Sequence, residues 1–212
     1  MTSIEALEWR YACKKFDDQK TIPNSVVDLL IKAFNLSASS YGLQPVKLLV
    51  IQNKSLQKEL LPVSMNQQQV VQASHLLLFC THLNINDAYI NEFFDRIIHQ
   101  RGTSPEILAG FRSAVLKEFG SKSQVEIDSW AAKQAYLAMG NMLTVCAMEG
   151  IDACPMEGFT PDEYDRVLDL KSKGLKSVLL MPIGYRAQDD PFAAMPKVRK
   201  SIDNSVLQIK VN

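Results

Sequence analysis

The 212-residue sequence lacks the marks of a membrane-spanning, secreted or polyanion-binding protein. Its 23 Lys and Arg residues equal its 23 Asp and Glu residues. The net charge is therefore zero, whereas general binding to nucleic acid or to an acidic membrane surface requires positive charge. No apolar run approaches the ~20 residues of a membrane-spanning helix, and the first residues have no apolar signal-peptide core. We therefore expect a cytoplasmic protein that binds anions only through local groups of cations.

Cysteine and histidine are also scarce, with four and three residues respectively. The three histidines lack the spacing of metal ligands. The cysteines contain no CxxC pair and lie in apolar or mixed surroundings: Cys13, Cys80, Cys146 and Cys154. We expect neither a disulfide framework nor a metal site.

Several catalytic signatures are missing. No two of the nine glycines are two residues apart, and none has P-loop spacing, which excludes the GxGxxG and Walker motifs. There is no GxSxG motif of a serine hydrolase. The paired carboxylates Asp17–Asp18 and Asp189–Asp190 lie in turn-like contexts, and we interpret them as solvated turn residues rather than as an acid–base pair.

The length and the pattern of apolar residues predict one domain over residues 1–212. Helical spacing and helix-end signals predict helices at 3–12, 25–36, 54–61, 66–73 and 124–149, with further starts after Asn86, at Pro105 and at a capping box over 160–163. Short apolar or alternating runs predict strands at 46–53, 75–82, 176–185 and 206–211. This irregular interleaving is compatible with an α+β fold and with a three-layer α/β arrangement.

The segment 124–149 is the longest predicted helix, and it ends before Gly150. Its side chains are small or apolar on nearly every face. A helix of this kind is normally buried, either in a core or in a subunit interface.

Two groups of cations stand near the two chain ends. Arg10 and Lys14 are four residues apart and would share a face on a helical turn. Lys197 and Arg199 are two apart, which places them on one side of an extended segment. Each group alone is typical of a solvated charged surface, but together they could clamp one phosphate. Spacing alone leaves both interpretations open.

Two polar segments are candidates for ligand contact. The sequence SASSYGLQP, residues 37–45, offers hydroxyls and backbone amides just before a predicted strand. The sequence DACPMEGF, residues 152–159, contains a turn that can direct N–H groups at a ligand. The simpler interpretation of both segments is an ordinary loop.

Five motifs follow one another in an order that resembles the FMN-dependent nitroreductase family. They are RYACKKFD, SxSSxxxQP, ASH before a strand, PMEGF, and PKxR near the end of the chain. The resemblance covers essentially the whole chain and is greatest to the oxygen-insensitive NAD(P)H nitroreductase and dihydropteridine reductase branch. It implies an α+β, three-layer α/β/α nitroreductase-like fold, in which helices flank a mostly antiparallel sheet. The long helix would lie at a homodimer interface, where the last strand pairs with the partner.

The resemblance also assigns the binding residues. The residues implied to contact FMN from the same subunit are Arg10, Tyr11, Ala12, Cys13, Lys14, Asn66, Pro155, Met156, Glu157, Gly158, Lys197 and Arg199. Those implied to reach FMN from the partner subunit are Ser39, Ser40 and Gln44. Those implied to contact substrate or nicotinamide are Tyr41, Gln69 and Arg101.

Within this set, the resemblance gives the phosphate to Arg10, Lys197 and Arg199. Lys14 would lie near the pyrimidine end of the flavin, and Asn66 at the polar edge of the ring. A backbone N–H of the strip 155–158 would address flavin nitrogen-5. The implied activity is reduction of nitroaromatics, quinones or related conjugated acceptors by NAD(P)H, through two-electron ping-pong hydride transfer. It requires no side-chain acid or base, and we assign no catalytic side chain.

The chain departs from the family pattern at four positions. Ala12 stands where relatives often carry serine, and Gly42 where asparagine is common. Val46 stands directly after Gln-Pro, where relatives often carry tryptophan, and Gln69 where near relatives carry lysine. The departures at Ala12, Gly42 and Gln69 leave open a flavin-binding or regulatory module without nicotinamide-driven turnover. The apolar long helix leaves open a helical interaction protein that requires no flavin.

Overall fold

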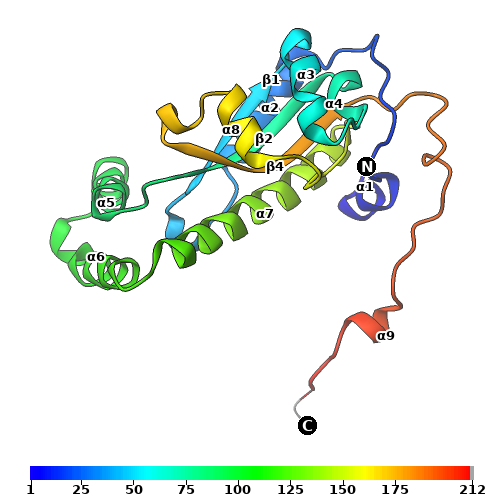
Figure 1. Cartoon of the computed structure of the whole chain (residues 1–212). Coiled ribbons are helices and arrows are strands. Elements are labelled where there is room, and N and C mark those ends of the chain that lie inside the picture. Colours follow the sequence, from blue (N-terminus) through cyan, green and yellow to red (C-terminus); the bar gives the residue numbers. More distant parts are fainter. Residues whose placement is uncertain (211–212) are drawn as a thin grey trace.

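The computed structural model describes residues 1–210, and in them the apolar runs form a four-stranded sheet (Figure 1). The strands are β1 (Val46–Ile51), β2 (His75–His82), β3 (Asp152–Ala153) and β4 (Leu175–Gly184). Their order across the sheet is β1-β2-β4-β3, and each neighbouring pair is antiparallel. Within residues 1–210, β1 is consequently an edge strand of the sheet.

β2 lies in the middle of the sheet, and its side chains reach both faces. Leu77 and Phe79 enter the core on one face, whereas Leu76, Leu78 and Cys80 enter the core on the other. This alternation follows from the two-residue repeat of a strand. Burial on both sides explains why the sequence of β2 is a continuous apolar run rather than an alternating one.

Helices cover both faces of the sheet. On one face lie α2 (Asn24–Asn35) and the long α7 (Gln124–Met148), with α1 (Ser3–Trp9) packed beside α7. On the other face lie α3 (Lys54–Leu60), α4 (Gln69–Gln72) and α8 (Pro161–Val167). The three-layer α/β/α arrangement confirms the predicted fold class.

Beyond the sheet, the first part of α7 extends alongside α5 (Asp87–Arg101) and α6 (Pro105–Gly120) at one end of the molecule (Figure 1). These elements share a separate core of buried side chains, which includes Phe94, Phe119 and Ile127. The remaining short elements are α9 (Ile202–Ser205) and the 3-10 turns Ser40–Gly42, Pro62–Ser64 and Lys171–Lys173.

The limits of α7 confirm the prediction for 124–149. Ser123 and Glu126 form a capping box at its start, which satisfies two free N–H groups. Gly150 follows its end with φ +67°, a left-handed conformation that favours glycine. Although α7 is apolar overall, it leaves Tyr136, Leu137 and Met148 exposed within the chain. No helix within residues 1–210 is long and apolar enough to cross a membrane.

Two predicted helices have other limits in the structure, and one predicted cap is absent. The first helix ends at Trp9 rather than at residue 12, because Arg10 has the extended backbone angles φ −70° and ψ 144°. The segment 66–73 forms only α4, since Asn66 has a left-handed φ of 54°. The predicted capping box at Thr160 is wrong. The Thr160 side chain makes no cap hydrogen bond, and the Thr160 backbone N–H donates to the carbonyl oxygen of Val63 at 2.8 Å.

The predicted last strand at 206–211 does not form within the described part of the single chain. Residues 206–210 are exposed and have no strand structure, and residue 211 lies outside the described part. A strand requires a hydrogen-bonding neighbour. The tail, residues 191–210, is instead exposed and runs past α1 (Figure 1).

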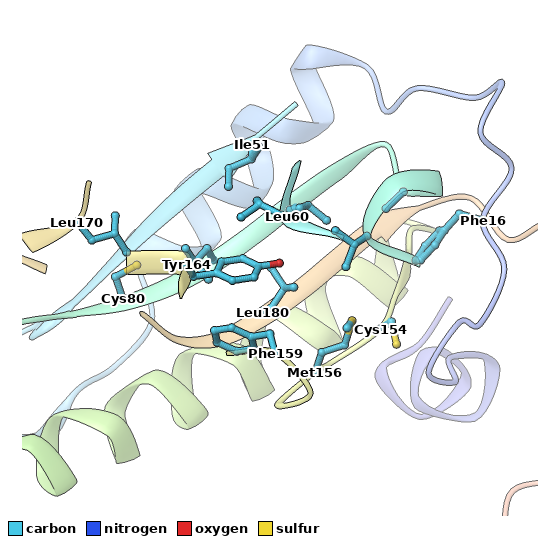
Figure 2. Close-up of a cluster of buried hydrophobic side chains, with 14 of the residues drawn as sticks. Phe16, Ile51, Leu60, Cys80, Cys154, Met156, Phe159, Tyr164, Leu170 and Leu180 are labelled. Atoms are coloured by element: carbon cyan, nitrogen blue, oxygen red, sulfur yellow. The ribbon is translucent and has the colours of Figure 1, made fainter. Parts of the chain in front are cut away.

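The core on the α8 face supports the strip 155–158. Figure 2 shows the Tyr164 ring within this cluster, with Phe159, Met156 and Cys154 along one side. The Tyr164 hydroxyl and Ser64 Oγ are 2.7 Å apart. Met156 exchanges two backbone hydrogen bonds with Leu180 of β4, at 2.8 and 3.1 Å. The start of the strip is therefore fixed to the middle of the sheet.

Candidate functional site

The N-terminal motif, residues 10–17, is an extended segment held on two sides. The N–H of Cys13 donates to Ala153 O of β3 at 3.2 Å. On the other side, the N–H of Asp17 donates to Tyr185 O at 2.8 Å, and that of Ala187 donates to Lys15 O at 2.9 Å. The shared helical face predicted for the cations of this motif is therefore wrong, because the backbone here belongs to the edge of the sheet.

The extended motif nevertheless brings the two groups of cations together. A cavity of about 350 Å³ lies between this segment and the start of the tail. Its lining residues come from both chain ends: Arg10, Tyr11, Ala12, Lys14, Phe192, Met195, Pro196, Lys197 and Arg199. The Lys197 ammonium also donates to the carbonyl oxygen of Arg10. The two ends thus form the opposite walls of one cavity.

The cations of this cavity destabilise one another. Burial lowers the pKa of Arg10, and the charge of Arg199 lowers it further. Lys197 is exposed, but its partial desolvation at the cavity lowers its pKa, with added contributions from Arg10 and Arg199. Within residues 1–210, none of these three side chains forms an ion pair with a carboxylate. A bound dianion would relieve this repulsion, so the cavity has the charge of a phosphate site.

Lys14 connects the cavity to the strip. Its ammonium lies 4.0 Å from Cys154 Sγ, directly before Pro155. Burial raises the pKa of the Cys154 thiol, although Lys14 and Arg10 oppose the shift. Burial raises the pKa of Cys13 to about 12. Both thiols stay protonated at neutral pH, which makes them poor nucleophiles.

The strip 155–158 has N–H groups that the protein does not use. No described residue accepts a hydrogen bond from the backbone N–H of Glu157 or Gly158. Gly158 also permits a close approach: its carbonyl accepts from Gln67 Nε2 at 2.7 Å, and a Cβ atom there would lie 2.7 Å from that same nitrogen. The exposed Asn66 precedes Gln67. The structure therefore brings the loop of Asn66 beside the strip.

The outer side of the strip is attached to α7. The hydroxyl of Tyr136 donates to Glu157 Oε1 at 2.7 Å. This hydrogen bond raises the pKa of Tyr136. Glu157 itself is exposed, so its carboxylate is held at the surface of the site.

The serine-rich segment lies elsewhere. Ser39 and Gln44 line a different cavity of about 620 Å³, between α2, β1 and α5. The N–H of Ser40 donates to Gln134 Oε1 at 2.9 Å, and that of Gln44 donates to Ser39 Oγ at 2.9 Å. Within one chain, the structure does not bring these residues to the cation cavity.

The three residues predicted to contact substrate or nicotinamide are scattered. Tyr41 has a left-handed φ of 58°, and its exposed ring packs edge-on against Phe119 at 5.9 Å between centroids. Gln69 is buried in α4. Arg101 is exposed at the last turn of α5 and lines neither of the two cavities.

Sequence reasoning missed a buried carboxylate next to the cavity. Asp189 is a solvated turn residue, as predicted, and pairs with Lys15. For Asp190 the same interpretation is wrong. Asp190 is only 4% exposed, and its carboxylate accepts hydrogen bonds from the Tyr11 hydroxyl and the Lys14 backbone N–H. These donors are more than 170 residues away in the sequence, so spacing within the doublet gives no signal of them.

A second missed pair is Arg186 and Asp152. Asp152 is buried at the start of β3, and the guanidinium of Arg186 pairs with it at 2.6 Å. The same guanidinium lies over the rings of Trp9 and Tyr11.

No group of three or more His, Cys, Asp or Glu side chains within residues 1–210 could hold a metal ion.

Comparison with known proteins identifies a family by sequence and a shared fold by structure. The family model described as "Nitroreductase family" matches residues 7–185. The putative NAD(P)H nitroreductase YfkO of Bacillus subtilis is 30% identical over 215 residues, covering 96% of this chain and 95% of that protein. A nitroreductase-like protein from Streptococcus mutans has a TM-score of 0.85 at 22% identity, over 98% of both chains. A putative nitroreductase from Exiguobacterium sibiricum, solved in complex with FMN, has a TM-score of 0.86 at 19% identity, over 99% of this chain and 98% of that one.

Proposed function

Since the chain belongs to the nitroreductase family, we propose that it is an FMN-dependent NAD(P)H oxidoreductase. Its acceptors would be nitroaromatics, quinones or related conjugated compounds, reduced by two-electron ping-pong hydride transfer. NAD(P)H and the acceptor would occupy the same place in turn, because the chain has no Rossmann fingerprint for a separate nucleotide site.

The cation cavity is the observation that carries this proposal. Arg10, Lys197 and Arg199 converge there without carboxylate partners among residues 1–210. A phosphate monoester carries up to two negative charges, and guanidinium and ammonium groups bind its oxygens through charge-assisted hydrogen bonds. The residues present therefore fit the phosphate of FMN. Ala12, which also lines the cavity, carries no hydroxyl, so the three cations would supply most of the binding.

Lys14 and the strip 155–158 would bind the rest of the cofactor. The Lys14 ammonium lies between the cavity and the strip, near Cys154. There it would stabilise negative charge at the pyrimidine end of the ring. The unused N–H groups of Glu157 and Gly158 would donate to acceptor atoms of the ring edge. When bound, FMN supplies the hydride-transfer chemistry, and the protein supplies binding, orientation and charge.

We further propose that the working unit is a homodimer. Apolar side chains are left exposed on α1 and α7, with Ile4 63%, Leu137 52% and Met148 47% exposed. Exposed apolar surface of this kind is typical of an interface. Ser39, Ser40 and Gln44 would then contribute to the partner's site. The tail segment 206–210, which has no neighbour in its own chain, would pair with the partner.

Spectroscopy of the purified protein tests the proposal. The protein should carry or take up FMN and be yellow, and anaerobic NADH or NADPH should bleach it until a quinone or nitroaromatic restores the colour. Failure to take up FMN would contradict the proposal altogether. Tight FMN binding without bleaching would instead favour a flavin-binding module without turnover. Sedimentation analysis should give twice the monomer mass, and a monomer with full activity would contradict the shared site.

A further inference from the structure

Asp190 is a buried carboxylate whose oxygens are occupied by hydrogen-bond donors. Its Oδ2 accepts from the Tyr11 hydroxyl at 2.7 Å, from the Lys14 N–H at 3.0 Å and from the Lys15 N–H at 3.2 Å. Its Oδ1 accepts from the Phe192 N–H at 3.0 Å. The Cys13 thiol is a further, weaker donor at 3.6 Å.

These donors belong to both walls of the cation cavity. Tyr11 and Lys14 line the wall formed by the N-terminal motif, whereas Phe192 lines the wall that leads to Lys197 and Arg199. One carboxylate thus joins two segments of chain that are about 180 residues apart.

We propose that Asp190 is a positioning residue that holds these two walls at the spacing required by the FMN phosphate. This inference rests on the proposed function, because FMN is the ligand whose phosphate the cavity would bind. Asp190 itself forms no ion pair with Arg10, Lys197 or Arg199. Its oxygens are occupied instead by neutral N–H and O–H donors, so the three cations stay unpaired with it and available to an anion.

The direction of a mutational effect separates positioning from simple electrostatics. Replacing a carboxylate near an anion site by a neutral amide removes a repulsive charge, and Coulomb's law alone predicts tighter phosphate binding. The proposed role predicts weaker binding. In Asp190→Asn, an amide NH₂ must face either the Phe192 N–H or the Tyr11, Lys14 and Lys15 donors, and a donor cannot accept from them.

The test compares FMN with riboflavin, which lacks the phosphate, as ligands of the flavin-free protein. Dissociation constants are measured by quenching of flavin fluorescence for wild type, Asp190→Asn and Asp189→Asn. Asp190→Asn should weaken FMN binding about tenfold or more, as expected for loss of charged hydrogen bonds, and should lower the preference for FMN over riboflavin. Asp189→Asn is the matched control: it also removes one negative charge, but from the neighbouring residue, whose side chain is exposed. It should leave both constants within about twofold.

Two results would overturn the inference: FMN binding by Asp190→Asn that is unchanged or tighter, and an equal loss of affinity for both flavins. Should Asp190→Asn not fold, Tyr11→Phe removes one donor and keeps the charge. It should lower the FMN preference by about threefold, in line with one hydrogen bond, and an unchanged preference would also overturn the inference. Wild-type protein that binds no FMN would contradict the proposed function, and this inference with it.

Discussion

Arg186 is bound to Asp152 through both its backbone and its side chain. Its N–H donates to Oδ2 at 2.8 Å, and its Nε donates to Oδ1 at 2.8 Å. The guanidinium lies 4.1 Å from the centroid of the Trp9 ring and 4.6 Å from that of the Tyr11 ring. Cation–π contacts of this kind add to the ion pair. The pair therefore joins the end of β4 and the start of β3 to the motif that forms one wall of the cavity.

Replacement of Arg186 by alanine should destabilise the protein strongly. It leaves Asp152, which is 4% exposed, as a buried carboxylate without its cation, and such a loss costs about 3 kcal/mol. Urea unfolding at pH 7 measures the effect. Arg166→Ala is the matched control, because Arg166 makes an exposed pair with Glu163 and its loss should cost less than about 1 kcal/mol. Equal losses in the two variants would contradict the assigned importance of the buried pair.

The double substitution Lys197→Ala/Arg199→Ala should separate cofactor binding from stability. Loss of two charged phosphate contacts should weaken FMN binding about 100-fold or more. Both side chains are exposed, and the cavity cations repel one another. Stability of the flavin-free protein should therefore change by less than about 0.5 kcal/mol, or rise. Isothermal titration and urea unfolding give the two quantities.

The control for that experiment is Lys200→Ala/Lys210→Ala. These two lysines belong to the same exposed tail but do not line the cation cavity. The control variant should keep FMN affinity within about twofold of wild type at 0.15 M salt, where distant charges are screened. A loss as large as that of the first variant would show that the tail acts only through its net charge.

The sequence was sufficient wherever one element carries its own signal. The sequence pattern predicts the limits of β2, His75–His82, because burial on both faces makes its central residues 76–80 a continuous apolar run. The capping box at Ser123 and the left-handed Gly150 mark the ends of α7 in the sequence itself. The ordered family motifs predict which cations would share a site. In each case the information lies within a few neighbouring residues or in a pattern that spans the chain.

The sequence was insufficient where distant segments decide the outcome. Asp190 resembles its neighbour Asp189 in the sequence, yet Asp190 is buried under donors of the N-terminal motif, whereas Asp189 makes only an exposed ion pair with Lys15. The helical spacing of Arg10 and Lys14 was misleading, because pairing with β3 keeps this segment extended. The segment 206–211 has the alternation of a strand, but its described residues, 206–210, form none within the chain.

Substitution of two glycines should have opposite effects on stability. In Gly158→Ala the new Cβ would lie 2.7 Å from Gln67 Nε2, and moving that side chain breaks its bonds to the carbonyls of Gly158 and Ser64. The cost should be about 1–2 kcal/mol. In Gly110→Ala, within α6, the Cβ meets nothing within 4 Å, and the higher helix propensity of alanine should stabilise by up to about 1 kcal/mol. Thermal unfolding checks both signs, and a stabilising Gly158→Ala would contradict the close approach of the strip to its neighbouring loop.

His75 should make the protein less stable as the pH falls below neutrality. It is 2% exposed at the start of β2, with Nδ1 2.8 Å from Ser74 Oγ. Burial lowers its pKa from 6.5, and the charge of Lys54 lowers it further. Below pH 6.5 the unfolded chain therefore takes up a proton that the folded protein does not. Stability should fall with decreasing pH, by up to about 1.4 kcal/mol per pH unit, until the pH reaches the lowered pKa of the folded state.

His75→Asn should remove this part of the pH dependence, since asparagine does not titrate and can still hydrogen-bond Ser74. Urea unfolding of wild type and variant at pH 7.5 and pH 5.5 measures it, and the variant should lose less stability between the two. His82 has a pKa lowered by burial and by Lys47, so it adds a slope of the same sign that remains in the variant. His99→Asn, at an exposed position, should keep the full wild-type slope. An identical slope in all three proteins would show that burial of the His75 ring does not govern acid sensitivity.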